Sequence, residues 1–130
     1  MKELSKHLGE MDYDGLFTDL TPKAQVRGGT IRKAATDTLD LKRGTVLAVS
    51  DKDNKLVILG TEAASGEKLT PDCILCDDIA VGATADEDVA VYTAGCFDPD
   101  KVAVASGYTM TASDLDNLRM RGIVFKAAAN

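Results

Sequence analysis

Residues 73–97, CILCDDIAVGATADEDVAVYTAGCF, contain two apolar runs on either side of an acidic connection that includes a glycine. The first run continues to residue 81, and the second begins at residue 89. The second run offers two alternating sets of side chains, Val89, Val91 and Thr93 on one side and Ala90, Tyr92 and Ala94 on the other. Both faces of such a strand can be covered, which is typical of the interior of a sheet. The stretch therefore predicts a paired β unit with an interior second strand.

A second β pair is predicted before this stretch. Residues 44–50, GTVLAVS, and residues 55–60, KLVILG, are both apolar, and the four residues between them, DKDN, are polar. This pattern predicts a β-hairpin with a four-residue loop. The small and polar residues 61–70 then predict a surface loop.

Shorter strands are predicted on both sides of these pairs. Gly28 and Gly29 indicate a turn, because glycine reaches positive φ without steric cost. A short strand is expected after them at residues 30–36. Two more are expected at residues 101–105 and 123–125.

One helix is predicted near the C-terminal end. Thr111 is a suitable N-cap and Asp114 follows three residues later, which approximates a capping box. Leu115 and Leu118 share a helical face, and Gly122 can end the helix in a left-handed conformation. Strands and helix together predict a single, mainly β domain.

The composition limits the classes of function. A chain of 130 residues suits one domain with one core. Its net charge of −6 disfavours direct nucleic-acid binding, which draws on clustered lysine and arginine. Aromatic residues are few, so we expect a thin core that is stabilised in part by contacts with partner subunits. We also expect a cytosolic protein, because neither a membrane span of about 20 apolar residues nor the apolar region of a signal peptide is found.

Basic residues concentrate between two more acidic parts of the chain. They are Lys23, Arg27, Arg32, Lys33, Lys42 and Arg43. Such a run is usually a solvated face. The alternative is a seam against an acidic neighbour.

The chain before Pro22 is predicted to be an arm. Gly9 and Gly15 interrupt any long helix, and only a weak helical spacing is present. Leu16 and Phe17 are interpreted as an apolar anchor that docks on a partner rather than on the domain's own core. The alternative is a frayed terminus.

The cysteines have the spacing of a metal or redox pair, but the rest of a site is missing. A structural zinc site needs four ligands, and only Cys96 and His7 remain to join Cys73 and Cys76. Residues three apart in a strand also point to opposite faces. We therefore expect buried, reduced cysteines with no metal and no obligatory disulfide.

Acidic residues gather around the central connection, at Asp77, Asp78, Asp86, Glu87 and Asp88. We expect a solvated loop, with a weak cation site as the alternative. The single histidine, His7, leaves little for acid–base chemistry, and no phosphate-binding or nucleophile motif is present. We therefore expect neither catalysis nor a cofactor.

Four phrases resemble a known family through their order and spacing. They are RGTVLAVS at residues 43–50, ILCDDI at 74–79, VAVYTAGCFD at 89–98 and TASDLDNLRMRGIVFK at 111–126. In this order the chain is similar to the head decoration proteins of tailed bacteriophages, the D-type proteins of lambda-like heads. The resemblance implies a compact, bent β-ribbon or β-clip (tulip-like) domain.

The same resemblance implies a viral structural protein and not an enzyme. Such proteins bind the outside of the expanded capsid as homotrimers at three-fold sites and stabilise the head. The implied partner is the major capsid protein, with no nucleic acid or membrane, and the implied location is the outer surface of the virion after assembly in the host cytoplasm. Residues 1–22 are then a flexible capsid-binding arm and residues 23–130 the decoration domain, with Leu16, Phe17 and Leu20 as anchors. The alternative is a small oligomeric β protein that binds a cation or ligand.

Overall fold

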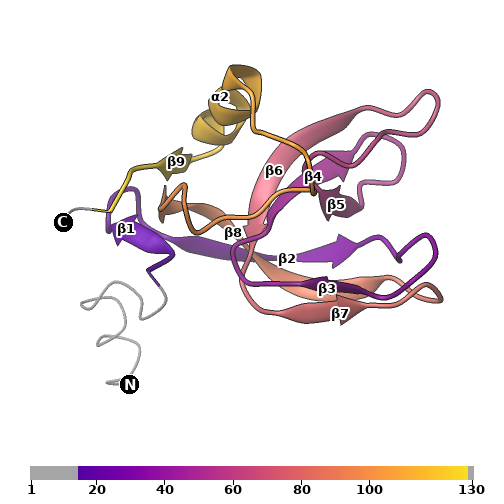
Figure 1. Ribbon diagram of the computed structural model, residues 1–130. Helices are drawn as coiled ribbons and strands as arrows, with labels where there is room; N and C mark the ends of the chain where they lie inside the picture. The colour runs from indigo at the N-terminus through magenta and orange to yellow at the C-terminus, as the bar shows by residue number, and fades with distance from the viewer. Residues whose placement is uncertain (1–14, 129–130) are drawn as a thin grey trace.

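The computed structural model describes residues 15–128 and is mainly β with one short helix, as the sequence predicts. The part of the predicted arm before residue 15 lies outside the described residues. Figure 1 shows the arrangement of the elements, which are β1 (Phe17–Asp19), β2 (Gln25–Ile31), β3 (Leu39–Leu41), β4 (Val46–Ser50), β5 (Leu56–Ile58), β6 (Leu69–Leu75), β7 (Ile79–Val81), β8 (Glu87–Phe97), α2 (Ala112–Met120) and β9 (Ile123–Phe125).

Strand β8 organises the fold. Along one side it pairs with β2 and then β1, and along the other side it pairs with β6 and then β9. Strand β2 pairs with β5, β5 with β4, and β4 with β6, so β8, β2, β5, β4 and β6 close into a ring. The predicted pairing within residues 73–97 is confirmed by the antiparallel partners Ile74 with Tyr92 and Leu75 with Val91. The prediction of an interior second strand is confirmed as well.

The predicted hairpin is also confirmed. Strands β4 and β5 are antiparallel, with Leu47 opposite Ile58 and Val49 opposite Leu56. The loop between them turns at Asn54, which has a φ of 59°. Asparagine adopts this left-handed conformation more readily than most residues.

Strands β4 and β6 are buried on both faces and separate two hydrophobic cores. Successive side chains of a strand point to opposite faces. Val46, Ala48 and Ile74 enter the outer core, whose members are Leu16, Val46, Ala48, Leu59, Ile74, Phe97, Leu118 and Ile123. Leu47, Cys73 and Leu75 point the other way into the inner core, whose members are Ile31, Leu41, Leu47, Leu56, Cys73, Leu75, Val81 and Val91.

Each core is completed by different elements. Leu41 and Val81 come from the small antiparallel sheet of β3 and β7, so this sheet covers the inner core. Leu118 of α2 and Ile123 of β9 belong to the outer core, so the C-terminal elements cover the opposite face. Figure 1 shows α2 and the pair β3–β7 on opposite sides of the ring.

The docking role predicted for Leu16 and Phe17 needs correction. Leu16 is 1% exposed within the outer core, and Phe17 packs against the same core. Strand β1 pairs with β8 through Phe17 and Asp19. Residues 16–19 therefore belong to the folded domain, because their side chains and main chain are both engaged by it. The expectation that this segment docks on a partner rather than on its own core is wrong.

Two predictions about short segments also need correction. Gly28 and Gly29 lie inside β2 rather than in a turn. A Cβ atom at Gly29 would lie 2.8 Å from Cδ1 of Leu56, so this glycine permits close packing between neighbouring strands. The strand predicted at residues 101–105 is reduced to an isolated parallel bridge between Thr45 and Ala103.

The helix begins and ends as predicted. Thr111 is the N-cap, and a capping box joins it to Asp114. Gly122 follows the helix with a φ of 102°. Leu118 is buried, whereas Leu115 is exposed. No helix among residues 15–128 is long and apolar enough to cross a membrane.

Candidate functional site

The chain enters the described domain at an aromatic cluster. The ring of Phe17 lies with its centroid 4.9 Å from that of Tyr92 and 4.7 Å from that of Phe97. The guanidinium carbon of Arg43 lies 5.8 Å and 5.3 Å from the Phe17 and Tyr92 ring centroids, within the range of a cation–π contact. These contacts fix the position of Phe17 against the outer core.

Hydrogen bonds hold Arg43 over these rings. Its side chain donates to the carbonyl of Cys76 at 3.1 Å and to the hydroxyl of Tyr92. Its backbone N–H donates to Oδ1 of Asp78 at 2.8 Å. Burial raises the pKa of the Tyr92 hydroxyl, so this group stays neutral and accepts the hydrogen bond.

The three predicted anchors are not brought together on one surface. Leu16 and Phe17 face the outer core, whereas Leu20 is 54% exposed. The segment between them is fastened to the C-terminal end of the domain. Thr18 donates to the carbonyl of Lys126 at 2.7 Å, and Nζ of Lys126 lies 3.0 Å from Oδ2 of Asp19. Of the three, Leu20 is therefore the one available to a partner.

Exposed Val26 lies close to Leu20 in the chain, at the start of β2, and was not predicted as a contact. Position along a strand does not reveal which face is covered, because that depends on elements distant in sequence.

The cysteines are buried and separate. Cys73 lies in the inner core, and Cys96 is buried at the end of β8. Burial raises the pKa of the Cys73 thiol, and raises that of Cys76 to about 11. Thiols with raised pKa values are poor nucleophiles and poor metal ligands. Within residues 15–128, no three side chains of the metal-ligating types converge on one point.

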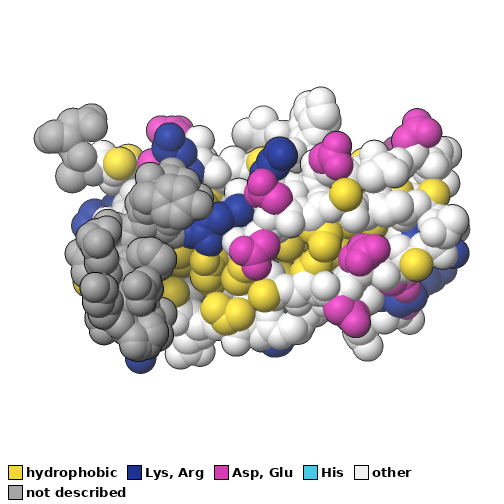
Figure 2. All heavy atoms as spheres, turned by 90° about the horizontal axis from the view of Figure 1, so that it is seen from below, with side chains coloured by type: hydrophobic (Ala, Val, Ile, Leu, Met, Phe, Trp, Pro, Cys, Tyr) yellow, Lys and Arg dark blue, Asp and Glu magenta, His cyan; other side chains and the backbone are white. Residues whose placement is uncertain are grey.

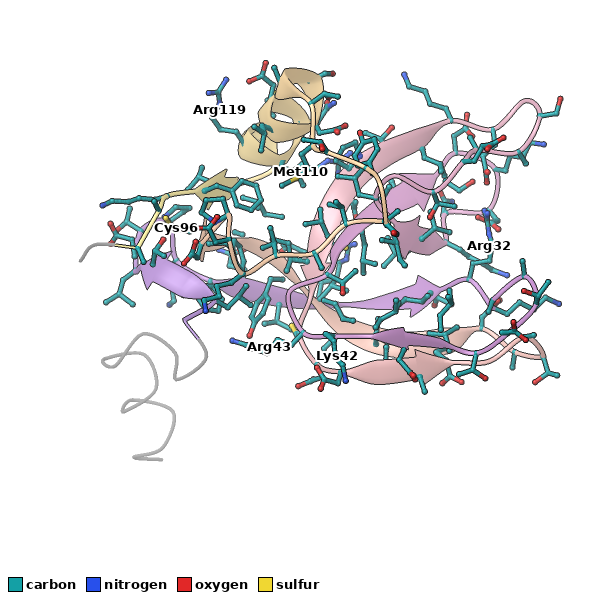
Figure 3. All side chains as sticks on the ribbon, viewed as in Figure 1. Arg32, Lys42, Arg43, Cys96, Met110 and Arg119 are labelled. Atoms are coloured by element: carbon teal, nitrogen blue, oxygen red, sulfur yellow. The ribbon has the colours of Figure 1, made fainter. Side chains whose placement is uncertain are left out.

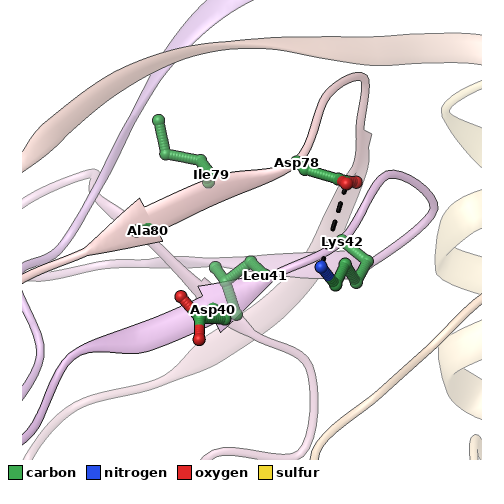
Figure 4. A pocket seen from close by; sticks show the side chains of 6 residues that line it. All are labelled: Asp40, Leu41, Lys42, Asp78, Ile79 and Ala80. Carbon is green, nitrogen blue, oxygen red and sulfur yellow. Dashed lines mark ion pairs between the residues drawn. The ribbon is translucent and has the colours of Figure 1, made fainter.

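The acidic residues near the central connection have separate partners. Asp78 accepts from the Arg43 backbone, and its Oδ2 lies 3.9 Å from Nζ of Lys42 (Figure 4). Asp86 pairs with Lys55 at 2.5 Å, and Asp88 accepts from the Thr30 hydroxyl at 2.9 Å. Figure 2 shows acidic side chains spread over this face rather than gathered at one point. The carboxylates therefore act as individual partners of neighbouring strands.

Most of the predicted basic run is paired within the chain. Asp72 is nearly buried and accepts from Arg27 at 2.7 Å and from Arg121 at 2.8 Å. Arg32 reaches both Asp53, at 3.1 Å, and Glu67, at 2.6 Å. These arginines join strands and loops of the same domain.

Two shallow depressions are present on the described surface. One lies on the β3–β7 sheet and is lined by Asp40, Leu41, Lys42, Asp78, Ile79 and Ala80 (Figure 4). The other lies between α2 and β9 and is lined by Leu115, Arg119, Ile123, Val124 and Phe125. Each has a volume of about 180 Å³, well below the roughly 300–1,000 Å³ of small-molecule sites. Neither depression therefore has the volume of a typical small-molecule site.

No family model matches the chain, and no curated protein matches it.

Proposed function

We propose that this protein is a viral structural protein that binds the outside of an expanded phage capsid as a homotrimer at three-fold sites and stabilises the head. The resemblance of residues 43–126 to head decoration proteins supports this function. A mainly β domain with a short helix near the C-terminal end is compatible with it. The proposed partner is the major capsid protein, and the proposed location is the outer surface of the virion.

The observation that carries the proposal is the anchored start of the domain. Leu16 and Phe17 are held in the outer core, and β1 is held by β8. Residues 1–14 therefore precede a segment, residues 16–19, that is packed into the domain. The exposed Leu20 follows this segment directly. We assign the capsid contact to residues 1–14 and Leu20, in place of Leu16 and Phe17.

The proposed mode of binding is strand addition. An extended segment that pairs with a capsid strand gains affinity from main-chain hydrogen bonds, and its alternate side chains supply specificity. A trimer presents three such segments at one three-fold site. Once one segment is bound, the others bind at a high effective concentration, so weak contacts combine into tight attachment.

Co-sedimentation with expanded, undecorated heads of the matching phage tests the function. We expect the full chain to saturate at one trimer per three-fold site, and not to bind immature shells or unrelated particles. Failure of the full chain to bind well-formed matching heads would overturn the proposal.

Removal of residues 2–14 tests the assignment of the contact. This variant keeps Leu16 and Phe17, so we expect an unchanged unfolding midpoint but no binding to heads. A deletion that continued to residue 20 would be unsuitable, because it would also remove part of the outer core. Normal binding by the shorter deletion would place the contact on the folded domain.

A further inference from the structure

We infer that the face formed by α2 and β9 is a contact between copies of this chain, with the exposed side of α2 in one copy seated in the α2–β9 groove of the next. The groove is the depression lined by Leu115, Arg119, Ile123, Val124 and Phe125. This inference rests on the proposed function in one respect, because the homotrimer supplies the second copy.

Exposed apolar side chains mark this face. Two apolar side chains of the nine-residue helix α2 are exposed, Met120 to 83% and Leu115 to 40%. Beside them, half-buried Val124 and Phe125 line the groove, and buried Ile123 forms part of its lining. An apolar ridge at Met120, on the exposed side of α2, and the groove that Leu115 lines therefore lie next to each other on a single copy. Exposed apolar surface of this kind is typical of an interaction site.

The groove also borders an open sheet edge. Within the described part of the chain, β9 pairs with β8 and with no other strand. An uncovered edge carries main-chain donors and acceptors that can pair with another chain, and native proteins usually cover or protect such edges. A neighbouring copy seated here would cover both the edge and the groove.

The charges of the face favour a second copy as the occupant. On α2, Asp116 and Arg119 form an exposed ion pair at 2.8 Å. The face is thus locally balanced on a chain whose net charge is −6. Copies of an acidic protein repel each other least where opposite charges alternate. Asp116 of one copy can also pair with Arg119 of the next.

The relative position of ridge and groove suits a closed ring. In a cyclic trimer each subunit offers two different patches, one to each neighbour. Here the ridge at Met120 and the groove beside β9, which Leu115 lines, are such a pair of adjacent patches. Figure 3 shows Arg119 projecting from α2 away from the sheets.

The first test introduces one charge on this face and one elsewhere. Leu115→Glu changes a residue that is 40% exposed, and its matched control, Leu39→Glu, changes a residue of β3 that is 41% exposed. Because both side chains are partly exposed, we expect the isolated subunit to fold with a carboxylate at either position. Sedimentation equilibrium over a concentration series should show that Leu115→Glu and Met120→Glu weaken self-association by at least about tenfold, since a charge would be buried without a partner. Leu39→Glu should associate as the wild type does.

A charge exchange between copies gives the second test. Asp116→Arg and Arg119→Asp should each weaken self-association, because each variant meets like charge at the contact. A 1:1 mixture of the two should associate more strongly than either variant alone, since the carboxylate introduced by one substitution meets the guanidinium introduced by the other. If the Asp116 and Arg119 pair acted only within one helix, mixing would restore nothing.

Head binding separates failure of this inference from failure of the proposed function. A wild type that binds heads and forms trimers, with Leu115→Glu and Met120→Glu forming trimers equally well, would overturn the inference and leave the function standing. A wild type that stays monomeric at every concentration would also overturn the inference. Absence of head binding by a trimeric wild type would overturn the function alone.

Discussion

The two hydrophobic cores differ in how the chain closes them. The inner core takes its members from residues 31–91, and they lie on the closed ring and on the β3–β7 sheet. The outer core takes Leu16 from one end of the described chain and Leu118 and Ile123 from the other. The outer core therefore depends on contacts between the two ends of the described chain. The strand pairings of the ring involve neither end, so we expect them to persist when the ends detach. We therefore expect the outer core to open at a lower free energy than the inner core.

The largest expected effect is in the outer core. Phe97 is fully buried, with its ring centroid 4.7 Å from that of Phe17 and 6.4 Å from that of Phe125. Phe97→Ala should lower the free energy of unfolding by about 3–5 kcal/mol in urea titrations, because it leaves a cavity as well as losing burial. Hydrogen exchange should quicken most in β1 and β9. Equal acceleration in β4 and β5 would contradict the division into two cores.

The matching change in the inner core is Leu75→Ala. Leu75 is fully buried among the members of the inner core. We expect a loss of about 2–5 kcal/mol on the same titration. Here hydrogen exchange should quicken across the ring strands as well as in the terminal elements, because the outer core depends on β4 and β6. A response confined to β1 and β9 would show that the ring does not support the outer layer.

Substitution of two glycines near the outer core compares the cost of backbone strain alone with the cost of strain plus a side-chain clash. Gly60 has a φ of 99°, and a Cβ atom there would lie 2.5 Å from Cγ of Tyr108. Gly107 has a φ of 81°, with no heavy atom within 4 Å of the same position. Gly107→Ala should cost about 1–2 kcal/mol, the penalty of a left-handed residue. Gly60→Ala should cost more, because Tyr108 must also move. Equal unfolding midpoints would show that Tyr108 adjusts freely.

The helix that covers the outer core gives a smaller effect. The Thr111 hydroxyl accepts from the backbone N–H of Asp114 at 3.1 Å. Thr111→Ala should cost about 1 kcal/mol in thermal or urea unfolding, because it removes the N-cap. Ser113→Ala, at an exposed position in the first turn, should change stability by less than about 0.5 kcal/mol. A comparable loss in both variants would show that the loss is not specific to the N-cap, since alanine is the better helix former at position 113.

Local patterns predicted the elements whose signals lie within a few residues. The hairpin of β4 and β5, the interior strand β8 and the capped helix α2 all carry such signals, in alternation, turn residues and the Thr111 to Asp114 spacing. Closure of the ring rests instead on pairings such as β2 with β5, which no local pattern encodes.

The N-terminal anchors show the same limit at the candidate site. Leu16 and Phe17 are apolar residues among polar ones, and the sequence does not distinguish a partner's surface from the domain's own core. Their burial depends on Phe97 and Ile123, which lie about 80 and about 105 residues further along the chain. The position of Arg43 over the Phe17 ring was missed for the same reason, since no spacing links these two residues.

Acid should weaken the ring side of the molecule before the outer layer. Glu67 accepts from Arg32 at 2.6 Å, from the Ser50 hydroxyl at 2.5 Å and from the Ala64 backbone at 3.0 Å. The Arg32 hydrogen bond, followed by the other two, lowers the pKa of Glu67 from 4.5 to about 2. The folded state therefore binds this proton less readily than the unfolded state. The resulting stability is complete above about pH 4.5 and is lost as the pH falls towards 2.

Glu67→Gln provides the measurement. At pH 7 the variant should unfold at lower urea than the wild type, and the difference between the two should shrink steadily between pH 5 and about pH 2 as the wild-type carboxylate takes up its proton. The exposed Glu62, in the same connection between β5 and β6, supplies the control Glu62→Gln. A difference between wild type and Glu67→Gln that stayed constant with pH would mean that the Arg32 contact stabilises the loop through packing rather than through the carboxylate charge. The contact of Glu67 with Arg32 and Ser50 would then stabilise the ring side of the molecule by packing, as the side chains of the inner core do.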